Sequence, residues 1–260
     1  MPSCEFDRLF KISVPHILEK VFFSLDYDTL MACNQVCKCW NSLISSKSYQ
    51  RRANELLGKK RENERKLCEY TFEGKVEQVQ QLLFSRVDPN CEGVLCNGGN
   101  PQTPLFYAST NGRKDVAIHK LLLNAGAEPN KADDFGQTPL DRAAFWGNKD
   151  VVHLLLYVGA DPNKANIFGE TPLEQASIGG KPDVVKLLLD AGADPNKANN
   201  DERTPLYWAS TYGHKEVVEM LLNRGADIKI ASKQIKRLGN ITPRSRSRSK
   251  KMAIGRKRRT

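Results

Sequence analysis

A period of 33 residues runs through the middle of this 260-residue chain and limits its fold more than any other feature. The tripeptide Thr-Pro-Leu begins at Thr103, Thr138, Thr171 and Thr204, so its spacings are 35, 33 and 33 residues. The dipeptide Gly-Ala recurs in step with it, at Gly126, Gly159, Gly192 and Gly225. One such unit cannot bury its apolar face alone, so the sequence predicts a stack of similar units.

The residues of each unit predict two short helices and a projecting finger. Threonine before proline is typical of a helix start, and a glycine nine residues later, such as Gly147, is typical of a helix end. A second helix follows, in which Val151, Leu154 and Leu155 lie on one face. Gly-Ala then ends that helix, and Asp-Pro-Asn opens a turn into the next unit.

The pattern resembles the ankyrin repeat, over about residues 66–232. The resemblance implies an all-α solenoid of about five repeats whose surface binds another protein. The first repeat is degenerate and is visible from Gly74 and the later Asp88-Pro89-Asn90.

Two departures from the repeat predict local changes. The stretch from Gly112 to Gly126 holds two more residues than its counterparts, which predicts a lengthened or bulged second helix. Near the end, Glu202 replaces the finger glycine and no Pro-Asn follows Asp227, so this repeat is expected to cap the stack.

The ankyrin resemblance also implies where the partner lies, which is along the finger tips and the inner helices. By alignment on Thr-Pro-Leu, the finger positions are Asp134, Phe135, Gln137, Ile167, Phe168, Glu170, Asn200, Asp201 and Arg203. The inner-helix positions are Thr110, Asn111, Phe145, Trp146, Ile178, Thr211 and Tyr212. Five of these are aromatic and are expected to be exposed, as interaction surfaces often are. The alternative is that some of them fill gaps between adjacent repeats.

Residues 12–44 do not fit the repeat and predict three short helices. Ile17, Leu18, Val21 and Leu25 form a broad helical stripe. So short a segment rarely sustains a core by itself, so its surplus apolar surface implies a partner, either the repeats or another chain.

A series of residues follows in a characteristic order and spacing: Pro15, Ile17, Leu18, Leu25, Leu30, Val36, Cys37 and Trp40. In this pattern the segment resembles the F-box, with a domain expected over residues 8–50. The resemblance implies docking on the Skp adaptor and, through it, on the cullin scaffold and RING subunit of an SCF ubiquitin ligase. The adaptor-binding residues it implies are Val14, Pro15, Ile17, Leu18, Val21, Phe22, Leu25, Leu30, Val36, Cys37 and Trp40, with Val14 where the family usually has leucine. The chain would then be a substrate-recognition adaptor with three N-terminal helices, repeats and a tail.

Other interpretations stay open. The N-terminal helices could only cap the repeats of a plain ankyrin scaffold or nuclear regulator. A pathogen or virus could use the same modules to redirect host ubiquitination. In each interpretation, residues 51–65 form a charged helical connector.

The net charge of +10 belongs to the C-terminal end of the chain. From Ile228 to Thr260 there are 13 Lys/Arg and no Asp/Glu, which leaves residues 1–227 with 27 basic and 30 acidic residues. Residues 233–260 are therefore predicted to be a disordered basic tail. Its clusters resemble a nuclear localisation signal that importin would bind, at Lys250, Lys251, Arg256, Lys257, Arg258 and Arg259. Nonspecific contacts with RNA or membrane, or a solubilising role, are the alternatives.

No motif predicts chemistry. The four histidines are scattered over different units, and Cys33, Cys37 and Cys39 have no fourth ligand at metal-site spacing. The sequence therefore predicts a protein that is not an enzyme and holds no cofactor or metal. No apolar stretch is long enough to cross a membrane and no signal peptide is evident, so a nuclear or cytoplasmic location is expected.

Overall fold

The computed structural model describes residues 47–93, 100–110 and 116–230. The helices in these ranges are α5 (Lys47–Glu73), α6 (Val76–Phe84), α7 (Pro104–Thr110), α8 (Val116–Asn124), α9 (Pro139–Trp146), α10 (Lys149–Tyr157), α11 (Pro172–Gly179), α12 (Pro182–Asp190), α13 (Pro205–Tyr212) and α14 (Lys215–Asn223). The same ranges contain no strand, although Gly93 and Gln102 form an isolated antiparallel bridge. The expected all-α class is confirmed there.

The chain divides into two compact units, Met1–Lys66 and Leu67–Thr260. All of the predicted F-box residues, from Val14 to Trp40, lie outside the described residues, as do the basic clusters from Lys250 onward. In the first unit, the described part of α5 is a charged helix with ion pairs along its length, such as Arg65 to Glu62 at 2.9 Å.

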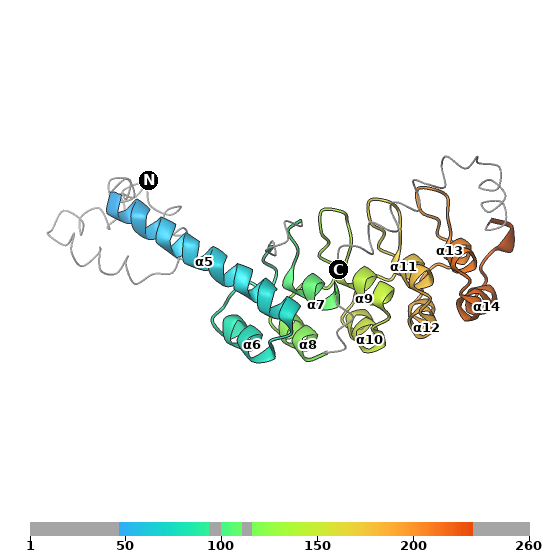
Figure 1. The fold of residues 1–260 in the computed structure, drawn as a ribbon, viewed down its shortest axis with the longest axis horizontal. Helices are drawn as coiled ribbons and strands as arrows, with labels where there is room; N and C mark the ends of the chain where they lie inside the picture. The colour runs from blue at the N-terminus through green and yellow to red at the C-terminus, as the bar shows by residue number, and fades with distance from the viewer. Residues whose placement is uncertain (1–46, 94–99, 111–115, 231–260) are drawn as a thin grey trace, which may run out of the picture. The chain divides into compact units, whose positions relative to one another are not determined.

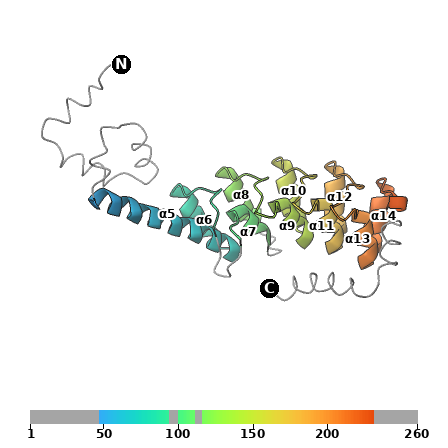
Figure 2. The same ribbon diagram turned by 90° about the horizontal axis from the view of Figure 1, so that it is seen from above.

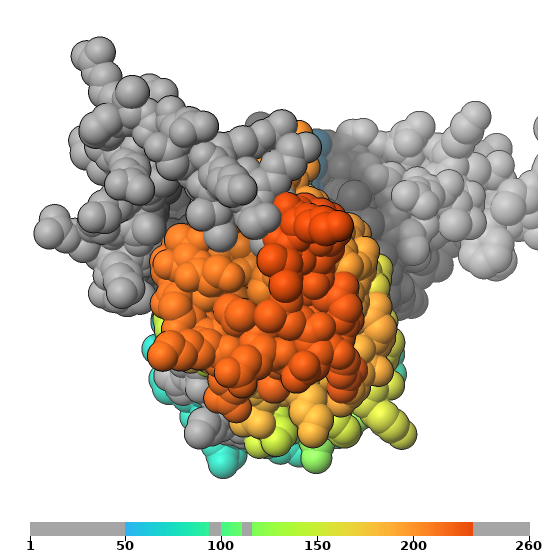
Figure 3. Space-filling model, turned by 90° about the vertical axis from the view of Figure 1, so that its right-hand side faces the viewer, coloured from blue at the N-terminus to red at the C-terminus, as the bar shows by residue number. Residues whose placement is uncertain are grey.

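The second unit is a row of helix pairs (Figures 1 and 2). Inner helices α7, α9, α11 and α13 pack side by side, and outer helices α6, α8, α10, α12 and α14 form a parallel row. Loops between each outer helix and the next inner helix project from one side as fingers. Figure 3 looks onto the end of this row, where α13 and α14 form the surface.

Local chemistry sets the ends of the inner helices, as the α9 helix illustrates. The Thr138 hydroxyl accepts a hydrogen bond from the Asp141 amide at 3.2 Å, and the Asp141 carboxylate accepts one from the Thr138 amide at 2.6 Å. This reciprocal capping box satisfies amides that a helix start leaves free. At the other end, Gly147 has φ of 80°, a left-handed conformation that glycine adopts without strain.

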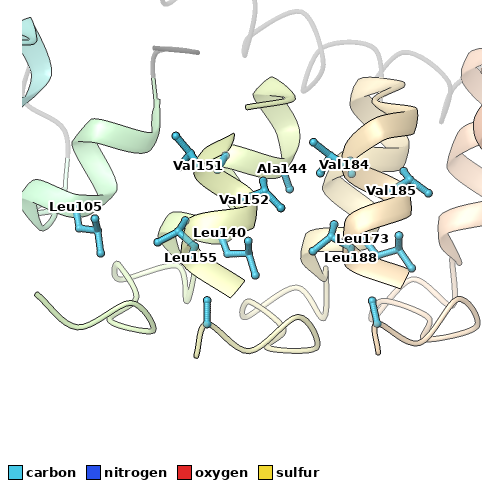
Figure 4. Close-up of a cluster of buried hydrophobic side chains, with 14 of the residues drawn as sticks. Leu105, Leu140, Ala144, Val151, Val152, Leu155, Leu173, Val184, Val185 and Leu188 are labelled. Atoms are coloured by element: carbon cyan, nitrogen blue, oxygen red, sulfur yellow. The ribbon is translucent and has the colours of Figure 1, made fainter. Parts of the chain in front are cut away.

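The core repeats with the helix pairs, as Figure 4 shows. The leucine of each Thr-Pro-Leu motif lies beside a buried leucine of the outer helix in its own repeat: Leu140 beside Leu155, and Leu173 beside Leu188. None of these four side chains is more than 1% exposed. Burying a side chain of this size stabilises the fold by about 1.5–3 kcal/mol, so each repeat depends on its neighbours.

Asparagines of the Asp-Pro-Asn turns link each repeat to the next. The Asn163 side chain donates to the Gly192 carbonyl at 2.9 Å and accepts from the Asp194 amide at 2.9 Å. Asn90, Asn130 and Asn196 make the equivalent pair of bonds one repeat apart. These bonds run along the stack at the period seen in the sequence, and they join backbone groups that a turn alone would leave unpaired.

The prediction of a lengthened or bulged second helix after Gly112 is not tested at its start, because residues 111–115 lie outside the described residues. From Val116 onward, the described part of α8 has nine residues, as α10, α12 and α14 have.

The last finger keeps its shape without its glycine. Gly136 and Gly169 have φ of 72° and 76°, and Glu202 at the equivalent position has φ of 61°. A Cβ at Gly169 would lie 2.8 Å from the Asn200 amide of the next finger. No further finger follows Glu202 in the described chain, so its Cβ meets no such backbone, and its left-handed conformation carries a conformational cost.

Candidate partner-binding face

The finger tips are joined to one another through their backbones. The Ile167 amide donates to the Phe135 carbonyl at 3.0 Å, and the Asn200 amide donates to the Phe168 carbonyl at 2.9 Å. The Asn200 side chain adds a third bond, to the Ile167 carbonyl at 3.0 Å. Three neighbouring fingers therefore form one continuous edge, already ordered before any partner arrives.

A side chain at the start of each tip holds its turn closed. The Asp133 carboxylate accepts from the amides of Phe135 and Gln137, at 3.0 and 2.9 Å. Asn166 and Asn199 make the same two bonds in the next two fingers. Sequence reasoning missed these positioning residues, although their recurrence five residues before the last three Thr-Pro-Leu motifs was a usable signal.

An apolar cluster lies on this edge. Phe135, Ile167 and Phe168 are 43%, 55% and 46% exposed. The Phe135 and Phe168 rings stack with centroids 6.5 Å apart and an angle of 21° between their planes. Contiguous exposed apolar surface is typical of interaction sites on folded proteins.

A second aromatic group lies where the inner helices end. Trp146 is 40% exposed, and Tyr212 is 47% exposed and stacks on Trp208 with centroids 5.9 Å apart. The Arg203 guanidinium lies over the Trp208 ring, 5.0 Å from its centroid. Phe145 is half-buried, so four of the five aromatic residues expected at exposed sites are exposed.

The remaining positions of the predicted face differ in their accessibility. Gln137 is buried and accepts a hydrogen bond from Arg142 at 2.6 Å, so its expected place among the partner contacts is not available to a partner. The exposed members are Asp134, Asn200, Asp201 and Thr211, and the half-buried members are Thr110, Glu170, Ile178 and Arg203. Asn111 lies outside the described residues.

We use the name fingertip face for the exposed residues at the three joined tips. They are Asp134, Phe135, Ile167, Phe168, Asn200, Asp201 and Glu202. Apolar groups lie at its centre and carboxylates lie at both ends, so it combines an apolar contact area with negative charge.

Two buried carboxyl groups lie at the start of the inner helices below the fingers. Glu174 is fully buried, and one of its oxygens accepts from the Asn199 amide group and the Trp208 indole, both at 2.7 Å. Its other oxygen has no hydrogen-bond partner. Burial, with the nearby Glu170 charge, raises the pKa of Glu174 to about 8.

Asp141 is the equivalent residue one repeat earlier. Burial raises its pKa to about 7, although the two hydrogen bonds from Thr138 act in the opposite direction. Sequence reasoning did not single out Asp141 or Glu174, because nothing in a single repeat reveals how completely the next repeat covers them.

The outer helices carry a different surface. A shallow groove of about 330 Å³ lies between α8 and α10 and is lined by Lys120, His153 and Tyr157 among others. In the described ranges, no cluster of three or more His, Cys, Asp or Glu residues could hold a metal ion. The helices that the structure describes include none long and apolar enough to span a membrane.

Comparison with protein families matches both halves of the chain. A family described as ankyrin repeats (3 copies) matches residues 67–166 and 155–232, so the chain belongs to the ankyrin-repeat proteins. A family described as F-box-like matches residues 15–54, ahead of the repeats. The chain is therefore an F-box/ankyrin protein, and both resemblances seen in the sequence are confirmed.

Curated relatives match only part of the chain. Potassium channel GORK of Arabidopsis thaliana is 34% identical over 34% of this chain, and E3 ubiquitin-protein ligase hecd-1 of Caenorhabditis elegans is 40% identical over 27%. The 26S proteasome non-ATPase regulatory subunit 10 of Dictyostelium discoideum is 35% identical over 34%. The chain spans 10%, 2% and 36% of these three proteins, which differ widely in their names. F-box and ankyrin modules are non-catalytic interaction domains, so the plain statement these findings support is a protein-interaction role.

Proposed function

We propose that this chain is a substrate-recognition adaptor of an SCF-type ubiquitin ligase. The F-box-like segment would dock on the Skp adaptor, and the ankyrin repeats would hold a protein for ubiquitination. The observation that carries the proposal is the joining of a docking module to an ordered, partly apolar fingertip face in one chain.

Such a protein needs no catalytic group of its own. Ubiquitin transfer belongs to other subunits of the ligase, and this chain would contribute by holding the substrate near them. Bringing reactants together can lower a barrier by several kcal/mol, on the order of 7–11 kcal/mol in well-oriented cases.

The fingertip face suits this role for two reasons. Its tips are fixed by backbone hydrogen bonds, so binding does not require ordering a loop, which would cost affinity. Its centre exposes Phe135 and Phe168, and buried aromatic side chains commonly dominate binding energy in interfaces. Trp146 and Tyr212 extend the apolar area toward the inner helices.

Capture of the Skp adaptor tests the docking half. A Pro15→Ala, Leu18→Ala double variant is expected to lose adaptor capture by the full chain, whereas the exposed outer-helix variant Tyr157→Ala is expected to retain it. Retained capture by the double variant would refute docking through the F-box-like segment. Absence of capture by the unaltered chain would instead favour a plain ankyrin scaffold.

Affinity capture with mass spectrometry tests the substrate half. The full chain is compared with a Phe135→Ala, Trp146→Ala, Tyr212→Ala variant, with circular dichroism to confirm that the variant folds. Proteins lost with the triple variant and kept with Tyr157→Ala are candidate substrates. An unchanged set of captured proteins would refute the assignment of these three residues.

We also propose that the basic clusters from Lys250 to Arg259 direct nuclear import by binding importin. Fusion of residues 233–260 to a reporter tests this, and nuclear accumulation is expected. A uniformly cytoplasmic reporter would contradict it.

A further inference from the structure

The charges that point outward from the fingertip face are negative. Asp134, Asp201 and Glu202 are exposed, and none of them is buried by the next finger. The single arginine beside them, Arg203, lies over the Trp208 ring and pairs with Asp201 at 3.4 Å.

The lysines of the same fingers are directed to the backbone of the preceding turn. The ammonium groups of Lys131, Lys164 and Lys197 donate to the carbonyls of Asn90, Asn130 and Asn163, at 2.8, 2.6 and 2.8 Å. They neutralise carbonyl dipoles at the base of the fingers and do not offset the carboxylates at the tips. A ligand for this face should therefore combine positive charge with apolar side chains.

The chain contains a segment of this chemistry. The 33 residues from Ile228 to Thr260 hold 13 Lys/Arg and no Asp/Glu. Apolar side chains are interspersed among them, at Ile235, Leu238, Ile241, Met252 and Ile254. This one segment therefore carries both kinds of group that the fingertip face would bind.

The segment is long enough to reach the face. Thirty residues follow Ile230, where the described chain stops, and a fully extended chain of that length spans roughly 100 Å. As a flexible coil it would have an end-to-end distance of about 30 Å. Helices pack about 10 Å apart, so Phe135 lies roughly 20 Å along the stack from the last finger.

We propose that residues 231–260 dock on the fingertip face of the same chain. Their Lys and Arg side chains would contact Asp134, Asp201 and Glu202, and an apolar side chain would cover the Phe135–Phe168 pair. Tethering sets the effective concentration of such a segment in the range of about 1 mM, so even weak contacts suffice for occupancy.

If the same face holds the substrate, as in the proposed function on which this inference rests, residues 231–260 compete with the substrate for the face. The chain would then select substrates that are themselves basic and apolar. Importin, if it binds the tail, would free the face at the same time.

Intramolecular photo-crosslinking of the full chain tests the proposal. A photoreactive phenylalanine analogue replaces Met252, and the chain is irradiated at low protein concentration in about 0.05 M salt, where charges act over longer distances. Crosslinks are expected in the peptides that contain residues 133–137, 166–170 and 200–203. Raising the salt to about 0.5 M is expected to reduce them by about tenfold.

Charge reversal at the face supplies the matched comparison. An Asp134→Lys, Asp201→Lys, Glu202→Lys variant is expected to lose the finger crosslinks. A control variant with the same charge change on exposed outer-helix positions, Glu77→Lys, Asp150→Lys and Glu219→Lys, is expected to keep them. Circular dichroism confirms that both variants fold.

Three outcomes would overturn the proposal: crosslinks spread evenly over the repeats, crosslinks that survive charge reversal at the face, or crosslinks that join two chains and rise with concentration. The last would identify a second copy as the occupant. The experiment requires no adaptor or substrate, so a negative result leaves Skp capture as a separate test of the proposed function.

Discussion

Glu174 should make this protein less stable as the pH rises, and a single substitution should remove the effect. The side chain is fully buried, and only one of its two oxygens accepts hydrogen bonds. Its pKa is raised from 4.5 to about 8, first by burial and then by the Glu170 charge, while the Arg203 charge acts against the shift. At neutral pH the carboxyl group is therefore protonated in the folded chain and ionised in the unfolded chain.

The sign and size of the effect follow from this difference. Below pH 4.5 both states are protonated, so the contribution of Glu174 to stability is fully present. Between that pH and about 8 only the unfolded state loses its proton, so the free energy of unfolding falls by about 1.4 kcal/mol per pH unit. By pH 7 the loss amounts to roughly 3 kcal/mol, and above pH 8 it stays constant.

The Glu174→Gln variant tests this reasoning because glutamine resembles the protonated acid. Its carbonyl oxygen can accept the bonds from Asn199 and Trp208, and its side chain does not ionise. We expect it to match the parent within about 1 kcal/mol at pH 5 and to be more stable by roughly 4 kcal/mol at pH 8.

Urea unfolding, followed by circular dichroism at several pH values, measures the difference. The slope of stability against denaturant must stay the same in both proteins, because repeat stacks can unfold in parts. Exposed Glu219→Gln is the control and should leave the pH profile unchanged. Equal destabilisation of Glu174→Gln at pH 5 and pH 8 would refute the reasoning, because it would mean that the folded protein needs the ionised carboxylate.

Other predictions concern the fingers and their links. Gly169→Ala should destabilise the stack by more than about 1 kcal/mol, because the new Cβ would meet the Asn200 amide at 2.8 Å. Glu202→Gly should stabilise it by about 1 kcal/mol. Urea unfolding measures both variants, and changes in the free energy of unfolding of equal size for Gly169→Ala and Glu202→Gly would contradict the role given to the next finger. Asn163→Ala should cost about 1–3 kcal/mol by the same measurement, since two backbone groups lose their partner, and an unchanged midpoint would argue that water replaces it. Phe168→Ala should weaken substrate capture by at least about tenfold with little change in unfolding midpoint, and undiminished capture would remove it from the binding face.

The parts of the fold that local chemistry determines could be predicted from the sequence. Thr-Pro at the helix start and glycine at the helix end act within one repeat, so the sequence alone predicts the helix ends at Thr138 and Gly147 correctly. The period itself predicted the stacking. The prediction of a lengthened or bulged second helix after Gly112 falls on residues 111–115, outside the described residues, and stays a prediction.

The candidate site was predictable in outline and not in detail. Its exposed residues follow from alignment of one repeat on another, which placed Phe135, Phe168 and Tyr212 correctly at the surface. Burial of Gln137 depends on Arg142 reaching back from the inner helix, and burial of Glu174 depends on the repeat that follows. Such relations between repeats are set by packing, which a repeat read by itself does not contain.

Glu202 also bears on how long this stack can be. Its left-handed backbone occurs where no further finger follows in the described chain, whereas a Cβ added at either equivalent glycine would lie within 3.1 Å of the next finger. A repeat duplicated onto this end would bring a new finger against the Glu202 side chain and meet a clash. Adding a repeat at this end, in evolution or by design, would therefore first require glycine in place of Glu202. The Glu202 side chain thus limits the number of repeats in the stack.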